Sequence, residues 1–172
     1  MDVGAIYEEA FGRIHDGVHH VVDGLAVSEL AWRADPEANS IAWLVWHLTR
    51  VQDDHVSEVA GDEQRWISGG WVERFALPYV PEATGYGQGA DEVGAIAVEA
   101  EVLTAYYDAV HQHTIEFVRT LTATDLEHVV DRRFDPPVTL GQRLVSVVED
   151  DLQHVGQAAF IRGLFERAKM TP

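Results

Sequence analysis

From Val93 to Leu121, apolar residues recur along the chain at alternating steps of three and four. Thr114 is the one polar residue that interrupts this series. Heptad spacing of this kind is typical of a long helix in a helical bundle. We therefore predict a helix that opens after Asp91 and runs to about Leu121.

Three other long segments also carry apolar residues at helical spacing. They cover about residues 2–23, 39–61 and 139–168, and segments containing Pro or Gly separate them. Asn39 or Ser40 is suited to cap the second helix, and Thr139 with Gln142 forms a capping box at the start of the fourth. No strand pattern occurs. We predict one all-α domain over residues 1–172, folded as an up-down four-helix bundle with a long loop between its second and third helices.

The long loop, about residues 62–90, has no clean helical period. A structureless connection of this length is uncommon in a compact domain and is often functional. Its aromatic residues predict that it packs on the bundle, and Trp66, Trp71 and Tyr79 are candidates for the wall of a substrate pocket. The glycine-rich stretch 85–89 neither follows a strand nor carries lysine, so we do not expect it to bind phosphate.

The composition excludes several classes of function. The formal net charge is −17, from 12 Lys and Arg against 29 Asp and Glu, so we expect no binding of DNA or RNA. Cysteine is absent, which excludes disulfides and thiolate metal ligands. The chain contains no charge-free apolar run of membrane-spanning length and no secretory signal at its start. We therefore expect a cytoplasmic protein that does not bind membranes and acts on a small molecule.

The fourth helical segment carries an acid and a histidine on its core-facing side. His154 lies in the middle of an apolar stripe, and Asp150 lies one turn earlier on the same face. A carboxylate on such a stripe costs several kcal/mol unless it is paired or bound to a metal. Side chains four residues apart on a helix can converge on one ion. The pair therefore predicts half of a metal site.

His47 on the second helical segment also faces the interior, between Trp43 and Val51. Alone, it would be interpreted as a core histidine bonded to a backbone carbonyl. Together with an inward Asp/His pair on another helix, it predicts a metal site made of His47, Asp150 and His154. Three protein ligands leave coordination positions open, which is typical of a reactive site rather than a structural one.

The remaining polar residues are interpreted as follows. Asp151 lies near the edge of the same stripe and is the candidate catalytic residue, whereas Glu149 points away from it. His15 and His19 are four residues apart, but the helical wheel turns them toward the flank, so we interpret them as facing solvent. We interpret His111 and His113 as surface or boundary residues. We interpret His55 as a boundary residue that could serve as a reserve ligand, and Asp54 as a residue that could support the metal ligands.

Two stretches resemble signatures of the DinB-like superfamily. Residues 39–48, NSIAWLVWHL, resemble its second-helix signature, and residues 154–163, HVGQAAFIRG, resemble its "H-x-G-Q … R-G" fourth-helix signature. The likeness extends over nearly the whole chain. It looks closest to uncharacterised actinobacterial members, and mycothiol-dependent maleylpyruvate isomerase has a related metal-binding domain.

The resemblance implies a DinB-like four-helix bundle with one metal ligand on the second helix and two on the fourth. The matching positions are His47, Asp150 and His154. Many members carry histidine where this chain has Asp150, while the isomerase-like members use a carboxylate there. Two histidines and a carboxylate suit zinc, with nickel, iron and manganese as alternatives. The resemblance also implies a possible homodimer.

Three functions remain open at this point. The first is a metal-dependent enzyme that uses a low-molecular-weight thiol such as mycothiol in S-transfer, conjugation or isomerisation, with Asp151 or Gln157 orienting the bound groups. The second is a metal-dependent hydrolase with Asp151 as the base. The third is a stress-linked metal-binding bundle without catalytic activity.

Overall fold

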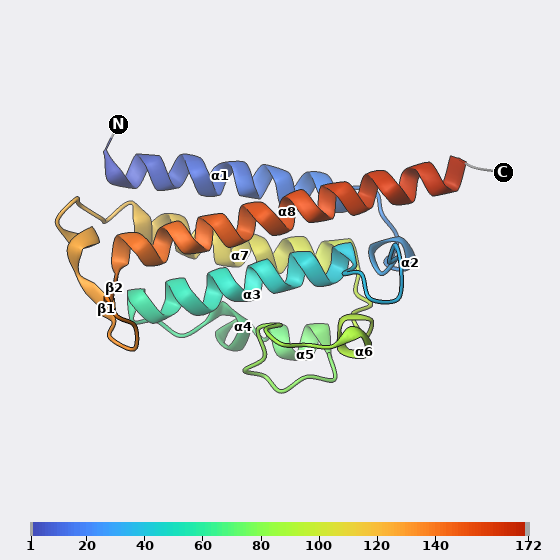
Figure 1. Ribbon diagram of the computed structural model, residues 1–172, viewed down its shortest axis with the longest axis horizontal. Helices are drawn as coiled ribbons and strands as arrows, with labels where there is room; N and C mark the ends of the chain where they lie inside the picture. Colours follow the sequence, from blue (N-terminus) through green and yellow to red (C-terminus); the bar gives the residue numbers. More distant parts are fainter. Residues whose placement is uncertain (1, 171–172) are drawn as a thin grey trace.

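Four long helices form the body of the protein (Figure 1), and this computed structural model describes residues 2–170. They are α1 (Val3–Val22), α3 (Ile41–Ala60), α7 (Ala100–Val118) and α8 (Leu140–Met170). Helix α3 packs against α7 and α8, and α1 packs against the same two helices from the other side. The predicted all-α four-helix bundle is confirmed.

The helices do not simply alternate in direction. Figure 1 shows α3 and α7 running the same way, both antiparallel to α1 and α8. The parallel pair is joined by a buried hydrogen bond in which Gln52 Nε2 donates to Thr114 Oγ1 over 2.7 Å. Thr114, the polar interruption of the heptad series, is therefore paired inside the core. The long connection after α3 makes this direction possible, because it carries the chain back to the end where α3 began.

Capping side chains fix the predicted helix ends. Ser40 Oγ accepts a hydrogen bond from the Trp43 backbone nitrogen at 3.1 Å and begins α3. Helix α8 begins with the predicted capping box: the Thr139 backbone nitrogen donates to Gln142 Oε1 at 2.9 Å, and the Gln142 nitrogen donates back to Thr139 Oγ1 at 3.4 Å. At the other end of α3, Gly61 takes the left-handed conformation that stops a helix.

The predicted start of the third long helix is wrong. Instead of one helix opening after Asp91, a short α6 (Ala90–Val93) ends at Gly94, and α7 begins only at Ala100. Val93 and Ile96 are nevertheless buried, because the connection itself places them in the core. The apolar spacing therefore continues across the interruption between the two helices, so the periodicity did not reveal where the long helix begins.

A two-stranded antiparallel sheet was also missed. Strands β1 (Val129–Asp131) and β2 (Val138–Thr139) lie just before α8, preceded by the 3₁₀ turn η1 (Asp125–Glu127). Strands of three and two residues are too short to show an alternating pattern. The inward side chain of β1 is polar: Asp131 is buried and accepts a hydrogen bond from Arg143 Nη2 at 3.0 Å.

The connection between α3 and α7 packs on the bundle, as predicted. It contains α4 (Arg65–Ser68) and α5 (Trp71–Phe75), while α2 (Val27–Leu30) lies in the earlier loop between α1 and α3. Trp66 and Trp71 are buried, and the Trp66 ring lies 5.1 Å from the ring of Tyr106. These two tryptophans therefore form core.

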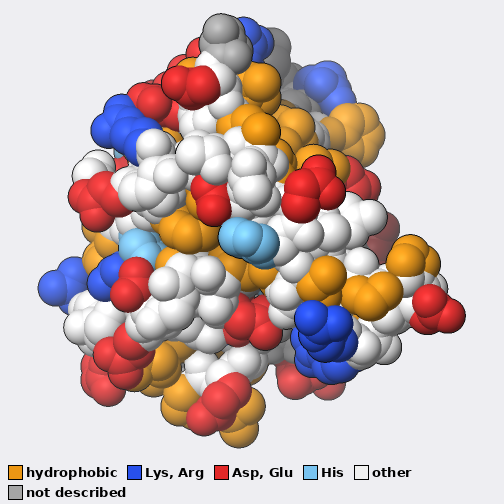
Figure 2. Space-filling model, turned by 90° about the vertical axis from the view of Figure 1, so that its left-hand side faces the viewer, with side chains coloured by type: hydrophobic (Ala, Val, Ile, Leu, Met, Phe, Trp, Pro, Cys, Tyr) orange, Lys and Arg blue, Asp and Glu red, His pale blue; other side chains and the backbone are white. Residues whose placement is uncertain are grey.

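None of the helices within residues 2–170 has an apolar stretch long enough to cross a bilayer. The surface reflects the acidic composition. Figure 2 shows one end of the bundle, and acidic side chains outnumber basic ones over that face. Such a surface attracts cations and repels phosphate polymers.

Candidate metal centre

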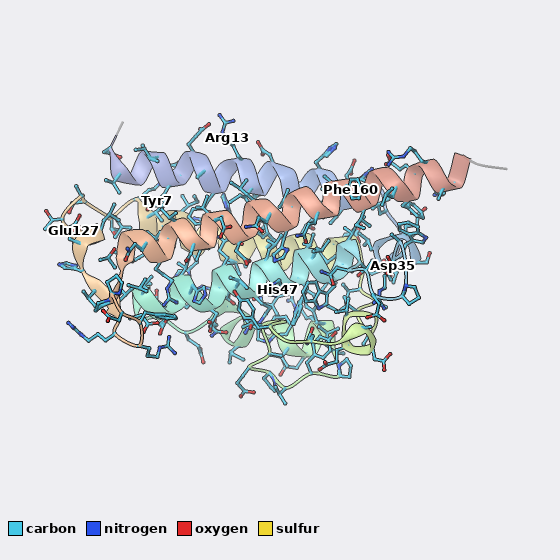
Figure 3. All side chains as sticks on the ribbon, in the orientation of Figure 1. Tyr7, Arg13, Asp35, His47, Glu127 and Phe160 are labelled. Atoms are coloured by element: carbon cyan, nitrogen blue, oxygen red, sulfur yellow. The ribbon has the colours of Figure 1, made fainter. Side chains whose placement is uncertain are left out.

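The three predicted ligands lie together where α3 packs on α8. His47 comes from α3, and Figure 3 shows it near the middle of the bundle, while Asp150 and His154 lie one turn apart on α8. Each of the three offers a ligand atom within 4.8 Å of the others. The two imidazole ring centres are 4.8 Å apart, and His154 Nε2 lies 3.7 Å from Asp150 Oδ1. The structure therefore brings together side chains that are more than 100 residues apart in sequence.

Hydrogen bonds set the tautomer of both histidines. His47 Nδ1 lies 2.5 Å from the backbone carbonyl oxygen of Thr84, and His154 Nδ1 lies 3.0 Å from Gln157 Oε1. The backbone carbonyl of Thr84 only accepts, so His47 Nδ1 carries the hydrogen and its Nε2 keeps its lone pair. The amide oxygen of Gln157, placed toward His154, favours the same tautomer there. Metal-binding histidines commonly donate their second ring N–H to a carbonyl or carboxylate in this way. Both rings are thus prepared to bind an ion through Nε2.

Asp150 lacks a conventional partner. Its Oδ2 atom is buried and finds no hydrogen-bond donor within the described part of the chain, and its side chain is 23% exposed. A largely desolvated carboxylate in this position is costly without a counter-charge. Donor atoms around a tetrahedral zinc ion with bonds of roughly 2.0–2.1 Å are separated by about 3.3 Å. The observed spacing therefore fits a divalent ion after small side-chain movements.

Burial keeps His47 in its neutral form. The imidazole is 3% exposed, and this desolvation lowers its pKa below the ordinary value, although the hydrogen bond to Thr84 acts in the opposite direction. Trp43 stacks on one face of the ring at a centre distance of 4.6 Å, and Tyr86 meets it edge-on at 5.2 Å. A neutral histidine is the form that binds metal, so protons compete weakly at this ligand.

The sequence predicted a functional loop over about residues 62–90 but not that Gly85 within it lies against His47. Gly85 has a φ of +104°, and a Cβ at this position would lie 2.5 Å from His47 Nδ1. Glycine is therefore required both by the backbone conformation and by the close approach. The signal in the sequence was the glycine-rich stretch 85–89, whose first residue lies against the candidate ligand His47. Thr84 and Tyr86, rather than Trp66 and Trp71, are the loop residues that contact the candidate site.

We predict that Gly85→Ala lowers both stability and metal affinity. The added Cβ has to displace His47 or the loop, and alanine is strained at this φ, so we expect a loss of about 1–3 kcal/mol in the free energy of unfolding. Urea denaturation and zinc titration measure the two effects. Gly87→Ala is the control, because it also has positive φ (+75°) but no atom lies within 4 Å of its added Cβ. Equal zinc affinity in the two variants would contradict the assigned role of the loop.

A buried ion pair in α3 holds the loop that contains Thr84 and Gly85. Arg50, which is fully buried in α3, donates from Nε to the carbonyl of Ala83 at 3.1 Å, next to Thr84. Asp53, one turn later and also fully buried, lies 3.6 Å from Arg50 Nη1. The pair therefore links the core of the bundle to the backbone carbonyl that orients His47.

Asp151 is completely buried, and neither of its carboxylate oxygens has a hydrogen-bond partner among residues 2–170. Burial, and secondarily the charge of Asp150, raise the pKa of the Asp151 carboxyl well above its usual range. The protonated acid is therefore favoured in the folded protein. A buried carboxyl without hydrogen-bond partners destabilises the fold, so we interpret Asp151 as a residue kept for function.

Asp54, His55 and Glu149 lie outside the cluster of candidate ligands. Asp54 accepts a hydrogen bond from Gln64 Nε2 at 2.6 Å, and His55 Nδ1 lies 2.7 Å from Arg143 Nη1, so both have partners away from the cluster of ligands. His55 is half-buried, as its boundary interpretation requires. Glu149 is exposed and points away from the core, as predicted.

One of the other histidine interpretations is wrong, and another is incomplete. His113 is 6% exposed, and its Nε2 bonds to Asp62 Oδ2 at 2.9 Å, so it is a core residue with a partner. His15 and His19 do not simply face solvent, because Asp108 of α7 lies against both rings. A helical wheel places these rings on the flank of α1 but does not show that α7 packs along that flank.

Open space flanks the candidate site on two sides. A cavity of about 430 Å³ is lined by Gln157, the partner of His154, together with Leu44 and Phe160. A second cavity of about 500 Å³ reaches Thr84 and Tyr86 on the His47 side and contains Arg143. The side chains of His154 and Asp150 are 16% and 23% exposed, so both are partly accessible to solvent.

Comparison with known proteins places this bundle in a family. Residues 10–158 match the DinB superfamily. The crystal structure of a conserved protein from Enterococcus faecalis superposes with a TM-score of 0.90 at 30% sequence identity, and the match covers 96% of this chain and 98% of that one. No curated protein matches this chain. The family match covers most of the sequence and the structural match covers nearly all of it, so the chain belongs to the DinB superfamily.

Proposed function

We propose that this protein is a metal-dependent enzyme in which His47, Asp150 and His154 hold one divalent transition-metal ion and a small-molecule thiol is the co-substrate. The observation that carries the metal assignment is the carboxylate of Asp150, which lies beside two imidazoles and has a buried oxygen without a hydrogen-bond donor in the described chain. Both imidazoles direct their second ring nitrogen to a carbonyl oxygen. This is the environment that protein metal ligands commonly have.

Zinc suits this donor set best, and nickel, iron and manganese are the competing ions. When bound, such an ion supplies a Lewis acid with open positions that lowers the pKa of a coordinated thiol or water. The thiol is favoured because zinc binds sulfur strongly and because the sequence resembles the domain found in mycothiol-dependent maleylpyruvate isomerase. We propose mycothiol or a similar cytoplasmic thiol as the co-substrate, and S-transfer, conjugation or isomerisation as the reaction.

We propose that other residues of the site orient the ligands, limit the entry of water and exchange a proton. Gln157 orients His154 through its Nδ1 hydrogen, and Thr84 orients His47 in the same way. Tyr86 covers the outer edge of His47, where an exposed phenol ring limits the entry of water. Asp151 is proposed as the catalytic residue because its buried carboxyl holds a proton beside Asp150 and can exchange it during the reaction.

We predict that Asp151→Asn separates catalysis from folding. The amide cannot exchange the proton, so turnover should fall by about 10²–10⁴-fold. Zinc content should stay unchanged, and the free energy of unfolding at neutral pH should rise, because burying the amide, unlike burying the acid, requires no uptake of a proton. Steady-state kinetics, metal analysis and urea denaturation measure the three effects. Normal turnover would remove Asp151 from the mechanism.

A non-catalytic metal-binding protein is the second candidate. The observation that favours it is the limited exposure of the ligands, since His47 is only 3% exposed. A metal-dependent hydrolase is a weaker candidate, because burial raises the pKa of Asp151, its nearest candidate base, and favours the protonated acid, which cannot accept a proton.

The deciding experiment is a thiol-transfer assay on zinc-loaded, tag-free protein with mycothiol, glutathione and cysteine as separate co-substrates. We expect turnover with at least one of them, and none in zinc-stripped wild type or in His154→Ala. Ester hydrolysis without thiol turnover would favour the hydrolase. The absence of any rate above that of the stripped protein would favour the non-catalytic alternative.

A further inference from the structure

We infer that the protein has a second divalent-metal site, formed by His15 and His19 of α1 and Asp108 of α7. It is independent of the proposed function. His15 Nε2 and His19 Nε2 lie 3.0 and 2.7 Å from the same oxygen, Asp108 Oδ1. Each of the three residues offers a ligand atom within 4.8 Å of the others.

The second cluster repeats the donor set of the first: two imidazoles and one carboxylate from two helices. His15 and His19 are four residues apart on α1, and their ring centres are 4.5 Å apart, so both rings reach the same point. Donor atoms around a tetrahedral zinc ion are about 3.3 Å apart. The nitrogens of His15 and His19 therefore need to move away from the carboxylate oxygen by about 0.3 and 0.6 Å to admit an ion between them.

Neighbouring groups support a cation at this point. Asp16 Oδ1 lies 3.7 Å from His15 Nδ1, beyond hydrogen-bond distance but close enough to add negative charge beside the cluster. A third imidazole, His111 of α7, lies 4.6 Å from the His15 ring, and its buried Nδ1 has no hydrogen-bond partner in residues 2–170. His111 is therefore an additional donor within reach of a small rearrangement.

The cluster is partly exposed and lies beside a cavity. The His15, His19 and Asp108 side chains are 33%, 40% and 48% exposed, so the cluster is open to solvent. An adjoining cavity of about 600 Å³ is lined by Asp16, His15 and His111, with two Glu–Arg pairs at its sides. The net charge of −17 adds a field that attracts cations to the whole surface.

The donor set also limits the ligand to a class of ions. Imidazole nitrogens favour zinc, cobalt, nickel and copper, whereas magnesium and calcium prefer oxygen-only sites. The ion would connect α1 to α7 and so hold the first helix of the bundle in place. The simpler alternative is that both histidines donate N–H bonds to Asp108 and bind nothing.

Zinc titration of tag-free, chelator-treated protein distinguishes these alternatives. Wild type should bind two equivalents, and His19→Gln and His154→Ala should bind one each. His20→Gln is the matched control, because His20 is the adjacent, exposed histidine outside the cluster and its variant should still bind two. Asp108→Asn should reproduce the loss seen in His19→Gln, and circular dichroism checks that each variant is folded.

Equal stoichiometry in folded His19→Gln, folded Asp108→Asn and His20→Gln would overturn the inference. The zinc stoichiometries of the variants test the second metal site separately from the first site, on which the proposed function rests. If only His154→Ala loses an equivalent, the second site is refuted and the first one stands. If only His19→Gln and Asp108→Asn lose one, the second site is supported and the first is refuted. Substitution with cobalt gives a further readout, because the absorption bands of each bound ion should disappear with its own histidine.

Discussion

Asp53→Ala is expected to lower the free energy of unfolding by about 3–5 kcal/mol, because it leaves the buried guanidinium of Arg50 without its counter-charge. Both side chains are fully buried. The carboxylate of Asp53 also accepts hydrogen bonds from the backbone nitrogens of Arg65 at 2.8 Å and Trp66 at 2.7 Å, and from the Tyr106 hydroxyl at 2.9 Å. Its removal therefore leaves several buried donors without an acceptor.

The neighbouring residue provides the control. Asp54 is partly exposed and accepts one side-chain hydrogen bond, so Asp54→Ala should cost less than about 1 kcal/mol. Urea denaturation of both variants measures the difference. Asp53→Ala should also weaken zinc binding, since Arg50 holds the carbonyl of Ala83 beside Thr84. Two variants of equal stability would contradict the anchoring role assigned to the Arg50–Asp53 pair.

Asp150→Asn is expected to reduce zinc affinity at the first site by at least about 100-fold, since even the loss of a residue that only supports a ligand costs about 10–100-fold. The amide keeps the shape of the side chain but removes the charge that balances the ion. The metal-free variant should be at least as stable as wild type, because its buried oxygen has no hydrogen-bond donor in the described chain and the substitution neutralises it.

Glu149→Gln is the matched control for this change. Glu149 precedes Asp150 on α8, carries the same charge and is exposed on the opposite side. Competition against a zinc-binding dye measures both affinities on protein without a histidine tag. An affinity of Asp150→Asn within a few-fold of Glu149→Gln would remove Asp150 from the ligand set.

Much of the fold follows from local patterns. Helical spacing and the capping residues Ser40, Thr139 and Gln142 predict α3 and the start of α8 because these signals depend on a few neighbouring residues. The proximity of the predicted ligands could also be predicted, because polar side chains that face the core of a bundle must pair with one another or bind a ligand. The start of α7 could not, because Val93 and Ile96 are buried by the connection rather than by a continuous helix.

The surroundings of the candidate sites depend on tertiary contacts that no periodicity reports. Gly85 lies against His47 only because a loop nearly forty residues away folds over α3. Asp108 meets His15 and His19 only because α7 packs along the flank of α1. A sequence pattern gives the direction of a side chain relative to its own helix, and the partner on that side is set by the fold.

The most direct test of the central claim is anomalous diffraction from crystals of zinc-loaded protein, recorded on both sides of the zinc absorption edge. We predict a peak at roughly 2.0–2.2 Å from His47 Nε2, His154 Nε2 and an oxygen of Asp150, the bond lengths of zinc to these ligands. A zinc-loaded crystal without a peak between α3 and α8, or with these three side chains bonded only to protein groups, would contradict it.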